Sequence, residues 1–79
     1  MKLTIKYFAA LRECVGKSEE EFSASVTTVE EVYQMLNDKY TFPVDKHHLK
    51  VALNEEYAQF DDKISEGDTI VFIPPVAGG

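Results

Sequence analysis

The sequence predicts one small α+β domain in which a mixed β-sheet packs against a single main helix. Two segments, Met1–Ala9 and Leu49–Leu53, alternate apolar and polar residues with a period of two, as a half-buried strand does. Between them, an apolar stripe at helical spacing follows Thr28. Near the end, Thr69–Ile73 is apolar on both faces, which is typical of a strand covered on both sides.

Length and composition exclude several classes of protein. Seventy-nine residues allow one domain with a small core, and a hydrophobic content of 44% is ordinary for a globular protein. The formal net charge of −6 argues against nucleic-acid binding and favours a basic partner or simple solubility. No apolar run approaches the roughly 20 residues of a membrane span, and the N-terminus lacks the apolar stretch of a signal peptide. With Cys14 as the lone cysteine, we expect a cytoplasmic protein without an internal disulfide.

The first strand carries one residue that does not fit its pattern. In Met1–Ala9 the apolar side chains of Leu3, Ile5 and Tyr7 share a face, whereas Phe8 falls on the polar face. Either the strand end curls and buries Phe8, or Phe8 is an exposed contact for a partner.

Two short elements should follow this strand. Ala9–Val15 is expected to form a helical turn that ends at Gly16 and buries Cys14 beside Leu11 as a small core residue. Glu19–Ser25 is expected to be an edge strand, because its consecutive glutamates oppose pairing with another chain. It should form a long-loop hairpin with the first strand.

The main helix has a clear start and end. Thr28 and Glu31 have the spacing of a capping box, in which each side chain satisfies a free backbone N–H. Thr41-Phe42-Pro43 should end the helix. The apolar stripe, expected to face the core, consists of Val29, Val32, Tyr33, Leu36 and Tyr40.

The remaining segments should complete a sheet of four to five strands. Val44–His48 is expected to be a loop, and Tyr57–Phe60 a short strand after a turn. The first and last strands should lie side by side at the centre, because both are strongly apolar. The second apolar face of Thr69–Ile73 is then covered either by a partner or by a loop. This order of elements predicts a β-grasp, ubiquitin-like roll over residues 1–73 with an extended, flexible tail over residues 74–79.

The tail is the most distinctive stretch: Pro74-Pro75-Val76-Ala77-Gly78-Gly79. The two prolines end a strand and stiffen the exit, because proline fixes φ and lacks an N–H. From Val76 to Gly79 an extended chain reaches about 13 Å. Such an end can thread a narrow channel and present the Gly79 carboxylate inside another protein's active site. An ordinary frayed terminus is the alternative.

Three stretches carry a resemblance to a known family: Tyr7 to Gly16, Glu66-Gly67-Asp68, and Phe72 to Gly79. Over its whole length the chain resembles the small, sulfur-carrier subunit of molybdopterin synthase, in the MoaD/ThiS-type ubiquitin-like family. The combination of Phe-Ala-x-Leu-Arg-Glu with Pro-Pro-Val-x-Gly-Gly is the specific part. Ala77 stands where this family often has Thr or Ser.

The resemblance implies a reaction cycle at the tail. An E1-like activating enzyme, using ATP and magnesium, adenylates the Gly79 carboxylate, and a sulfur donor converts it to a thiocarboxylate. The large subunit of molybdopterin synthase then accepts the tail and transfers sulfur to precursor Z (cyclic pyranopterin monophosphate), which forms the molybdopterin dithiolene of the molybdenum cofactor. Glycine leaves the reacting carbon unhindered, and Gly78 lets the backbone pass a constriction. No cofactor or metal is expected to bind stably to this chain, which has no catalytic side chains of its own.

The resemblance also implies where partners bind. Phe8, Tyr57 and Ile73 are expected to form an apolar patch for the large subunit and the activating enzyme, in a heterotetramer of two small and two large subunits. The tail residues expected to contact partners are Pro74, Pro75, Val76 and Ala77. The alternatives are another acceptor such as thiamin thiazole or tRNA, a ubiquitin-like modifier of protein lysines, or a ubiquitin-like binding module that is never activated.

Overall fold

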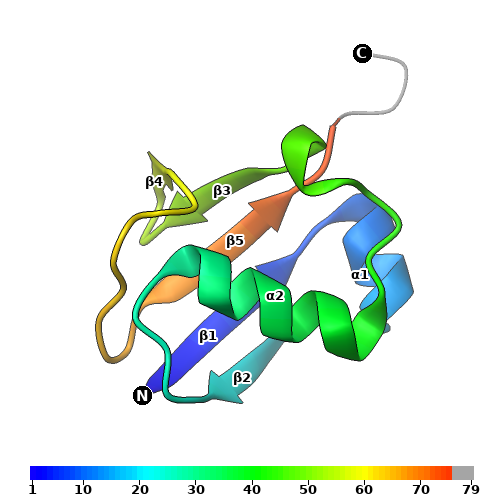
Figure 1. The fold of residues 1–79 in the computed structure, drawn as a ribbon. Coiled ribbons are helices and arrows are strands. Elements are labelled where there is room, and N and C mark those ends of the chain that lie inside the picture. Colours follow the sequence, from blue (N-terminus) through cyan, green and yellow to red (C-terminus); the bar gives the residue numbers. More distant parts are fainter. Residues whose placement is uncertain (76–79) are drawn as a thin grey trace.

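The computed structural model describes residues 1–75. Its main features are a five-stranded sheet and one long helix that crosses the inner face of that sheet (Figure 1). Its elements are β1 (Lys2–Tyr7), α1 (Ala9–Val15), β2 (Glu19–Ser23), α2 (Val29–Tyr40), the 3-10 helix η1 (Lys46–His48), β3 (Lys50–Leu53), β4 (Glu56–Ala58) and β5 (Thr69–Ile73). The strand order is β2-β1-β5-β3-β4. This is the β-grasp arrangement, and the predicted fold is confirmed.

The central pair of strands, β1 and β5, runs parallel, and all other pairs are antiparallel. In the parallel register Ile5 lies beside Ile70 and Tyr7 beside Phe72. All four side chains are buried, with at most 1% of their surface exposed. The adjacency of the first and last strands, predicted from their apolar character, is therefore confirmed.

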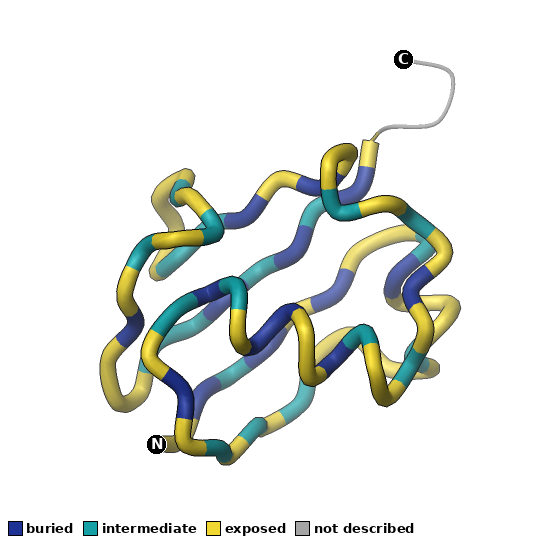
Figure 2. Tube along the Cα trace, viewed as in Figure 1, coloured by how far each residue is buried: buried dark blue, intermediate teal, exposed yellow. Residues whose placement is uncertain are grey.

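The helix α2 covers the inner face of this sheet and closes the core (Figure 1). Along the strands, buried positions alternate with more exposed ones, which shows that one face packs and the other does not (Figure 2). The ring of Tyr33 on α2 lies 6.1 Å from that of Phe72 on β5, measured between centroids. Among residues 1–75 no helix has the length and apolar character that a membrane crossing requires.

Hydrogen bonds with nearby residues cap both ends of α2. The hydroxyl of Thr28 accepts a hydrogen bond from the Glu31 backbone N–H, and the Glu31 carboxylate accepts one from the Thr28 N–H at 3.1 Å, so the predicted capping box is present. At the other end Thr41 takes a left-handed conformation with φ 56°. The Asn37 side chain accepts a hydrogen bond from the Phe42 N–H at 2.9 Å and fixes the turn that buries Phe42.

A carboxylate ties β2 to β1 and α2. Glu20 accepts hydrogen bonds from the hydroxyls of Tyr7 and Tyr40, the latter at 2.9 Å, and forms an ion pair with Lys17 at 3.4 Å. Burial alone would raise the pKa of Glu20, but these hydrogen bonds and the lysine charge outweigh it, so the pKa lies below its ordinary value. Burial, and then the bond to Glu20, raise the pKa of Tyr7. The sequence pattern did not indicate this cluster, because the two tyrosines lie 13 and 20 residues from Glu20 in the sequence.

Two expectations about the chain are wrong. Cys14 is exposed rather than a core residue, because the short helix α1 buries only Leu11, and the Cys14 thiol donates to the Tyr40 carbonyl at 3.4 Å. The expected loop Val44–His48 contains the single turn η1, in which His47 and His48 are both exposed.

Glu20→Gln tests the tyrosine-carboxylate cluster. The change should lower the free energy of unfolding by about 1 kcal/mol at neutral pH, because charge-assisted hydrogen bonds are roughly twice as strong as neutral ones. Since the folded-state pKa of Glu20 is depressed, this stabilisation is complete above the unfolded-chain pKa of about 4.5 and is lost as the pH falls through the folded value. Denaturant unfolding at neutral pH and near pH 3 measures the difference.

The control is Glu19→Gln, which alters an exposed carboxylate one residue earlier on the same strand. It should change the stability little at either pH. A Glu20→Gln penalty that stays the same in acid would contradict the role given to the Glu20 charge.

Candidate functional site

The candidate site begins where β5 leaves the sheet. We call Ile73, Pro74 and Pro75 the tail root. Ile73 still pairs with Lys50 of β3, Pro74 is buried and Pro75 is exposed. Because proline has no N–H to donate, the ladder cannot continue past Ile73, as the sequence predicted. The remaining predicted tail residues lie outside the described part of the chain; they are Val76, Ala77, Gly78 and Gly79.

The 3-10 helix η1 lies beside the tail root (Figure 1). Lys46 anchors η1 to α2 through an ion pair with Glu30, and its ammonium lies 5.3 Å from the ring centroid of Phe60. The bond from Lys46 lowers the pKa of Glu30. The Asp45 carboxylate accepts a hydrogen bond from the His47 N–H at 3.0 Å, which lowers the pKa of Asp45 and caps the turn. The surroundings of the root are therefore held in place by charged contacts.

Phe8 is exposed because of the way β1 passes into α1. It continues the extended backbone of β1, with φ −125° and ψ 153°, so it points to the face opposite the buried Tyr7. The next residue, Ala9, has a positive φ of 49°, which turns the chain sharply into α1. As a result 48% of the Phe8 side chain is exposed, which decides between the two sequence-based alternatives in favour of a surface position.

The three apolar residues predicted to contact partners share the outer face of the sheet, opposite α2. Tyr57 of β4 is 79% exposed and lies across from Ala52 of β3, which in turn lies across from Val71 of β5. Ile73 is half-buried and lies one row further toward the tail. We call this set the outer apolar patch; its members are Phe8, Ala52, Tyr57, Val71 and Ile73.

Two members of the patch were not chosen from the sequence. Val71 was recognised only as part of an apolar second face, and Ala52 was not singled out. The alternation of β3, with Val51 facing the core, places Ala52 outward and was the available signal.

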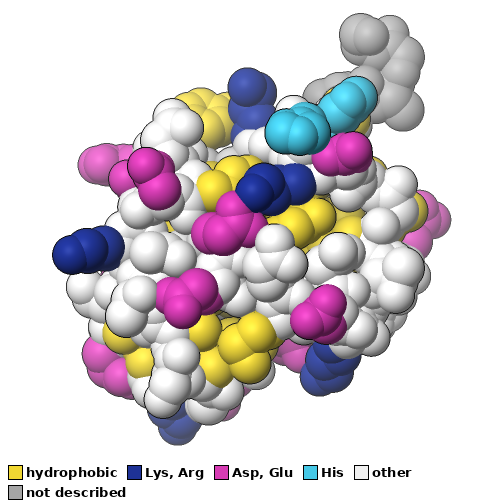
Figure 3. Space-filling view, in the orientation of Figure 1, with side chains coloured by type: hydrophobic (Ala, Val, Ile, Leu, Met, Phe, Trp, Pro, Cys, Tyr) yellow, Lys and Arg dark blue, Asp and Glu magenta, His cyan; other side chains and the backbone are white. Residues whose placement is uncertain are grey.

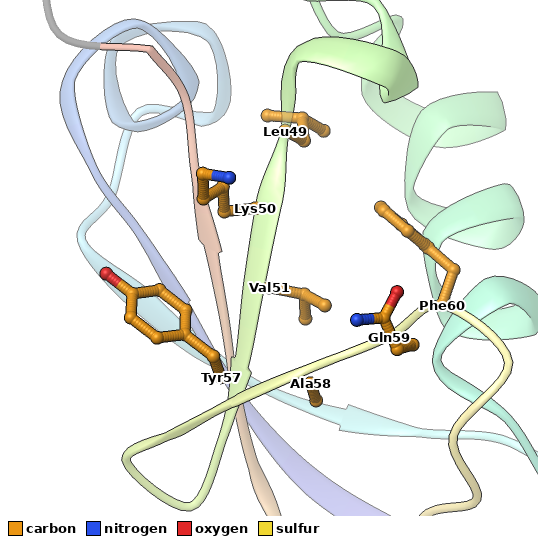
Figure 4. A pocket seen from close by; sticks show the side chains of 7 residues that line it. All are labelled: Leu49, Lys50, Val51, Tyr57, Ala58, Gln59 and Phe60. Atoms are coloured by element: carbon orange, nitrogen blue, oxygen red, sulfur yellow. The ribbon is translucent and has the colours of Figure 1, made fainter.

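A groove of about 380 Å³ lies at the edge of the sheet, where the chain turns away after β4. Figure 4 shows Tyr57 and Lys50 on one side of β3, and Val51 and Phe60 on the other side, toward α2. The groove is lined by Leu49, Lys50, Val51, Tyr57, Ala58, Gln59 and Phe60. This lining holds no acidic residue, histidine or cysteine. Across residues 1–75, no three such side chains gather in a way that would hold a metal ion.

The fold, the tail root and the exposed sheet face together define a ubiquitin-like β-grasp protein. The model of the ThiS family matches residues 5–79, so the chain belongs to the ThiS family. It is 32% identical over 80 residues to the molybdopterin synthase sulfur carrier subunit of Escherichia coli K12, with 98% of this chain and 99% of that protein covered. The resemblance noted from the sequence motifs is confirmed.

Solved structures share the fold over the full chain. SAMP1 from Haloferax volcanii superposes with a TM-score of 0.84 at 24% identity, with all of both chains covered. The complex of subunits 1 and 2 of the molybdopterin-converting factor from Helicobacter pylori contains a chain that matches with a TM-score of 0.71 at 21% identity, again over the whole of both chains. At these identities the similarity concerns the fold.

Phe8→Asp tests whether Phe8 belongs to the surface. Phe8 is the N-cap residue of α1 and provides no side-chain capping bond, whereas aspartate is a favoured N-cap. The gained cap offsets the lost apolar contact, so the free energy of unfolding should stay within about 1 kcal/mol of the wild type. Chemical denaturation measures it, with the buried Leu11→Asp as the destabilised reference. A loss above about 3 kcal/mol, typical of a core position, would refute the surface assignment.

Proposed function

We propose that this chain is the sulfur-carrier subunit of a molybdopterin synthase, with its chemistry at the Gly79 carboxylate. The observation that carries the proposal is the full-length similarity to a molybdopterin synthase sulfur carrier subunit, on a chain that ends in Gly78-Gly79. The outer apolar patch next to the tail root supports it, because an enzyme that binds this face receives the tail at the same time.

The proposed cycle uses two partner enzymes. An E1-like activating enzyme, which supplies the ATP and magnesium site, joins the Gly79 carboxylate to AMP and releases pyrophosphate. This step is needed because a carboxylate is a poor electrophile. A sulfur donor then attacks the acyl carbon, AMP leaves, and a thiocarboxylate remains. No side chain at Gly79 obstructs that attack.

The second enzyme is the large subunit of molybdopterin synthase. It takes up the tail, and each thiocarboxylate delivers one sulfur atom to precursor Z and is returned by water to the Gly79 carboxylate, so two thiocarboxylated chains supply the two sulfurs of the dithiolene. The Helicobacter pylori complex of subunits 1 and 2 supports such a pairing, since its matching chain has this fold. We place the cycle in the cytoplasm and the assembly in a heterotetramer of two small and two large subunits.

In this proposal the folded body and the tail have separate tasks. Phe8, Tyr57 and Ile73 supply binding energy, because exposed aromatic and aliphatic side chains are the usual anchors of an interface. The prolines of the tail root then direct the chain away from the sheet into the partner. No acid, base or nucleophile from this chain is required, so the cofactors belong to the partners.

Changing the length of the tail is the sharpest test. Deletion of Gly79, or one residue added after it, should abolish molybdopterin formation in a reaction reconstituted with the large subunit, the activating enzyme and a sulfur donor. The reacting carbon is then misplaced by about 3.5 Å, one extended residue. Thermal unfolding should be unchanged in both variants, because the folded body is untouched.

Ala77→Ser is the matched control, since it alters the tail but not its length or end, and it should keep activity. Full activity of either length variant would overturn the carrier proposal. Complementation of a strain that lacks the molybdopterin synthase small subunit identifies the acceptor. Activation of the tail without complementation would instead favour thiamin thiazole, tRNA or protein lysines as acceptors.

A further inference from the structure

The chain as a whole is acidic, but two exposed lysines, Lys6 and Lys50, lie directly beside the outer apolar patch. The formal net charge is −6, and acids such as Glu31 and Asp38 lie exposed on α2. Figure 3 shows acidic side chains, with basic ones among them, on the side of the molecule where α2 lies. On the opposite face, the charged residues of the central strands β1 and β3 that border the patch are Lys6 and Lys50.

The strand register fixes both lysines against the patch. Lys6 lies beside Val71 in the parallel pair β1–β5, and Lys50 lies beside Ile73 in the antiparallel pair β3–β5. Both side chains are exposed. Figure 4 shows Lys50 on the same side of β3 as Tyr57. The two cations therefore flank the apolar side chains, and Lys50 lies next to the tail root.

Neither lysine forms an ion pair in the described part of the chain. The ion pairs within residues 1–75 are Lys17–Glu20 and Lys46–Glu30. Glu19 faces Lys6 in the β1–β2 register, but the two groups form no ion pair. Both ammonium groups are thus unpaired within residues 1–75, and the nearby Glu19 carboxylate reduces the positive potential around Lys6 but not around Lys50.

A hollow of about 310 Å³ next to the patch brings one of these lysines within reach of an incoming side chain. Its lining consists of Lys6, Asn54, Glu55, Thr69 and Val71. The Asn54 amide accepts a hydrogen bond from the Thr69 N–H at 2.9 Å and donates one to Asp68 at 2.9 Å, so this wall is fixed before binding. Glu55 is the only anion of the lining.

We propose that the outer apolar patch binds a partner surface that is apolar at its centre and carries carboxylates opposite Lys6 and Lys50. This rests on the proposed function, because the partner is the large subunit that receives the tail. The apolar centre supplies affinity, and the lysines at its rim orient the partner and speed association. Rim charges act over about 8 Å at physiological salt, so a partner on this face meets Lys6 and Lys50 together with Glu19 and Glu55, while the acids on the side of α2 are screened.

Charge reversal at the rim tests the proposal with the large subunit of the same organism as partner. Lys6→Glu and Lys50→Glu should each weaken binding about tenfold or more at physiological salt, because attraction becomes repulsion. Lys50→Gln, which only removes the attraction, should fall between the wild type and Lys50→Glu. Higher salt should slow association of the wild type more than that of the reversed variants.

Lys63→Glu is the matched control. It makes the same change in net charge at another exposed lysine. The backbone of Lys63 forms an isolated β-bridge with Thr28, at the start of α2 and away from the outer face of the sheet. Its affinity should stay within about twofold of the wild type. Circular dichroism of each variant confirms that it is folded.

The outcomes separate this proposal from the proposed function. If Phe8→Asp weakens binding while Lys6→Glu and Lys50→Glu bind as well as or more tightly than the wild type, the partner is not acidic there and only the charge proposal is overturned. If the wild type binds neither the large subunit nor the activating enzyme, the proposed function is overturned, and the charge proposal with it.

Discussion

The parallel pairing of β1 with β5 is the constraint on which the rest of the structure depends. It places the first and last strands of the chain at the centre of the sheet, where Ile5, Tyr7, Ile70 and Phe72 are almost completely buried. Because the two strands run in the same direction, the end of β5 and the end of β1 lie at the same edge of the molecule. The tail root and Phe8 are therefore neighbours, although they are separated by most of the sequence.

This pairing gives the sheet two different faces. The inner face is closed by α2 and holds the core, while the outer face keeps a group of apolar side chains at the surface. The elements around the tail root are fixed by short-range contacts, including the Lys46–Glu30 ion pair that holds η1 to α2. In the proposed function the partner binds the folded domain, and the C-terminal residue of the chain carries the reacting group.

The sequence was sufficient to predict the fold because its periodicities are strong and its caps are explicit, as at Thr28 and Gly16. The prediction from sequence failed where a residue's environment depends on contacts with distant parts of the chain. Cys14 has the helical spacing of a core residue, but spacing does not reveal that a seven-residue helix at the sheet end buries only Leu11. The turn η1 is three residues long, too short to have a period.

The candidate site was predictable in part for the same reason. Phe8 could be identified as an exception to its strand pattern, yet its exposure depended on the turn at Ala9, which no composition rule specifies. The positions of Lys6 and Lys50 beside the patch depend on strand register, which pairs residues distant in sequence. The net charge of the chain therefore did not indicate that two lysines lie beside the patch.

The most direct measurement is the intact mass of the purified chain after incubation with the activating enzyme, ATP, magnesium and a sulfur donor. The account predicts a mass gain equal to the replacement of one oxygen by one sulfur, confined to the C-terminal peptide that contains Gly79 and absent when ATP is left out. An unchanged mass under conditions in which the same enzyme activates a known sulfur carrier would contradict it.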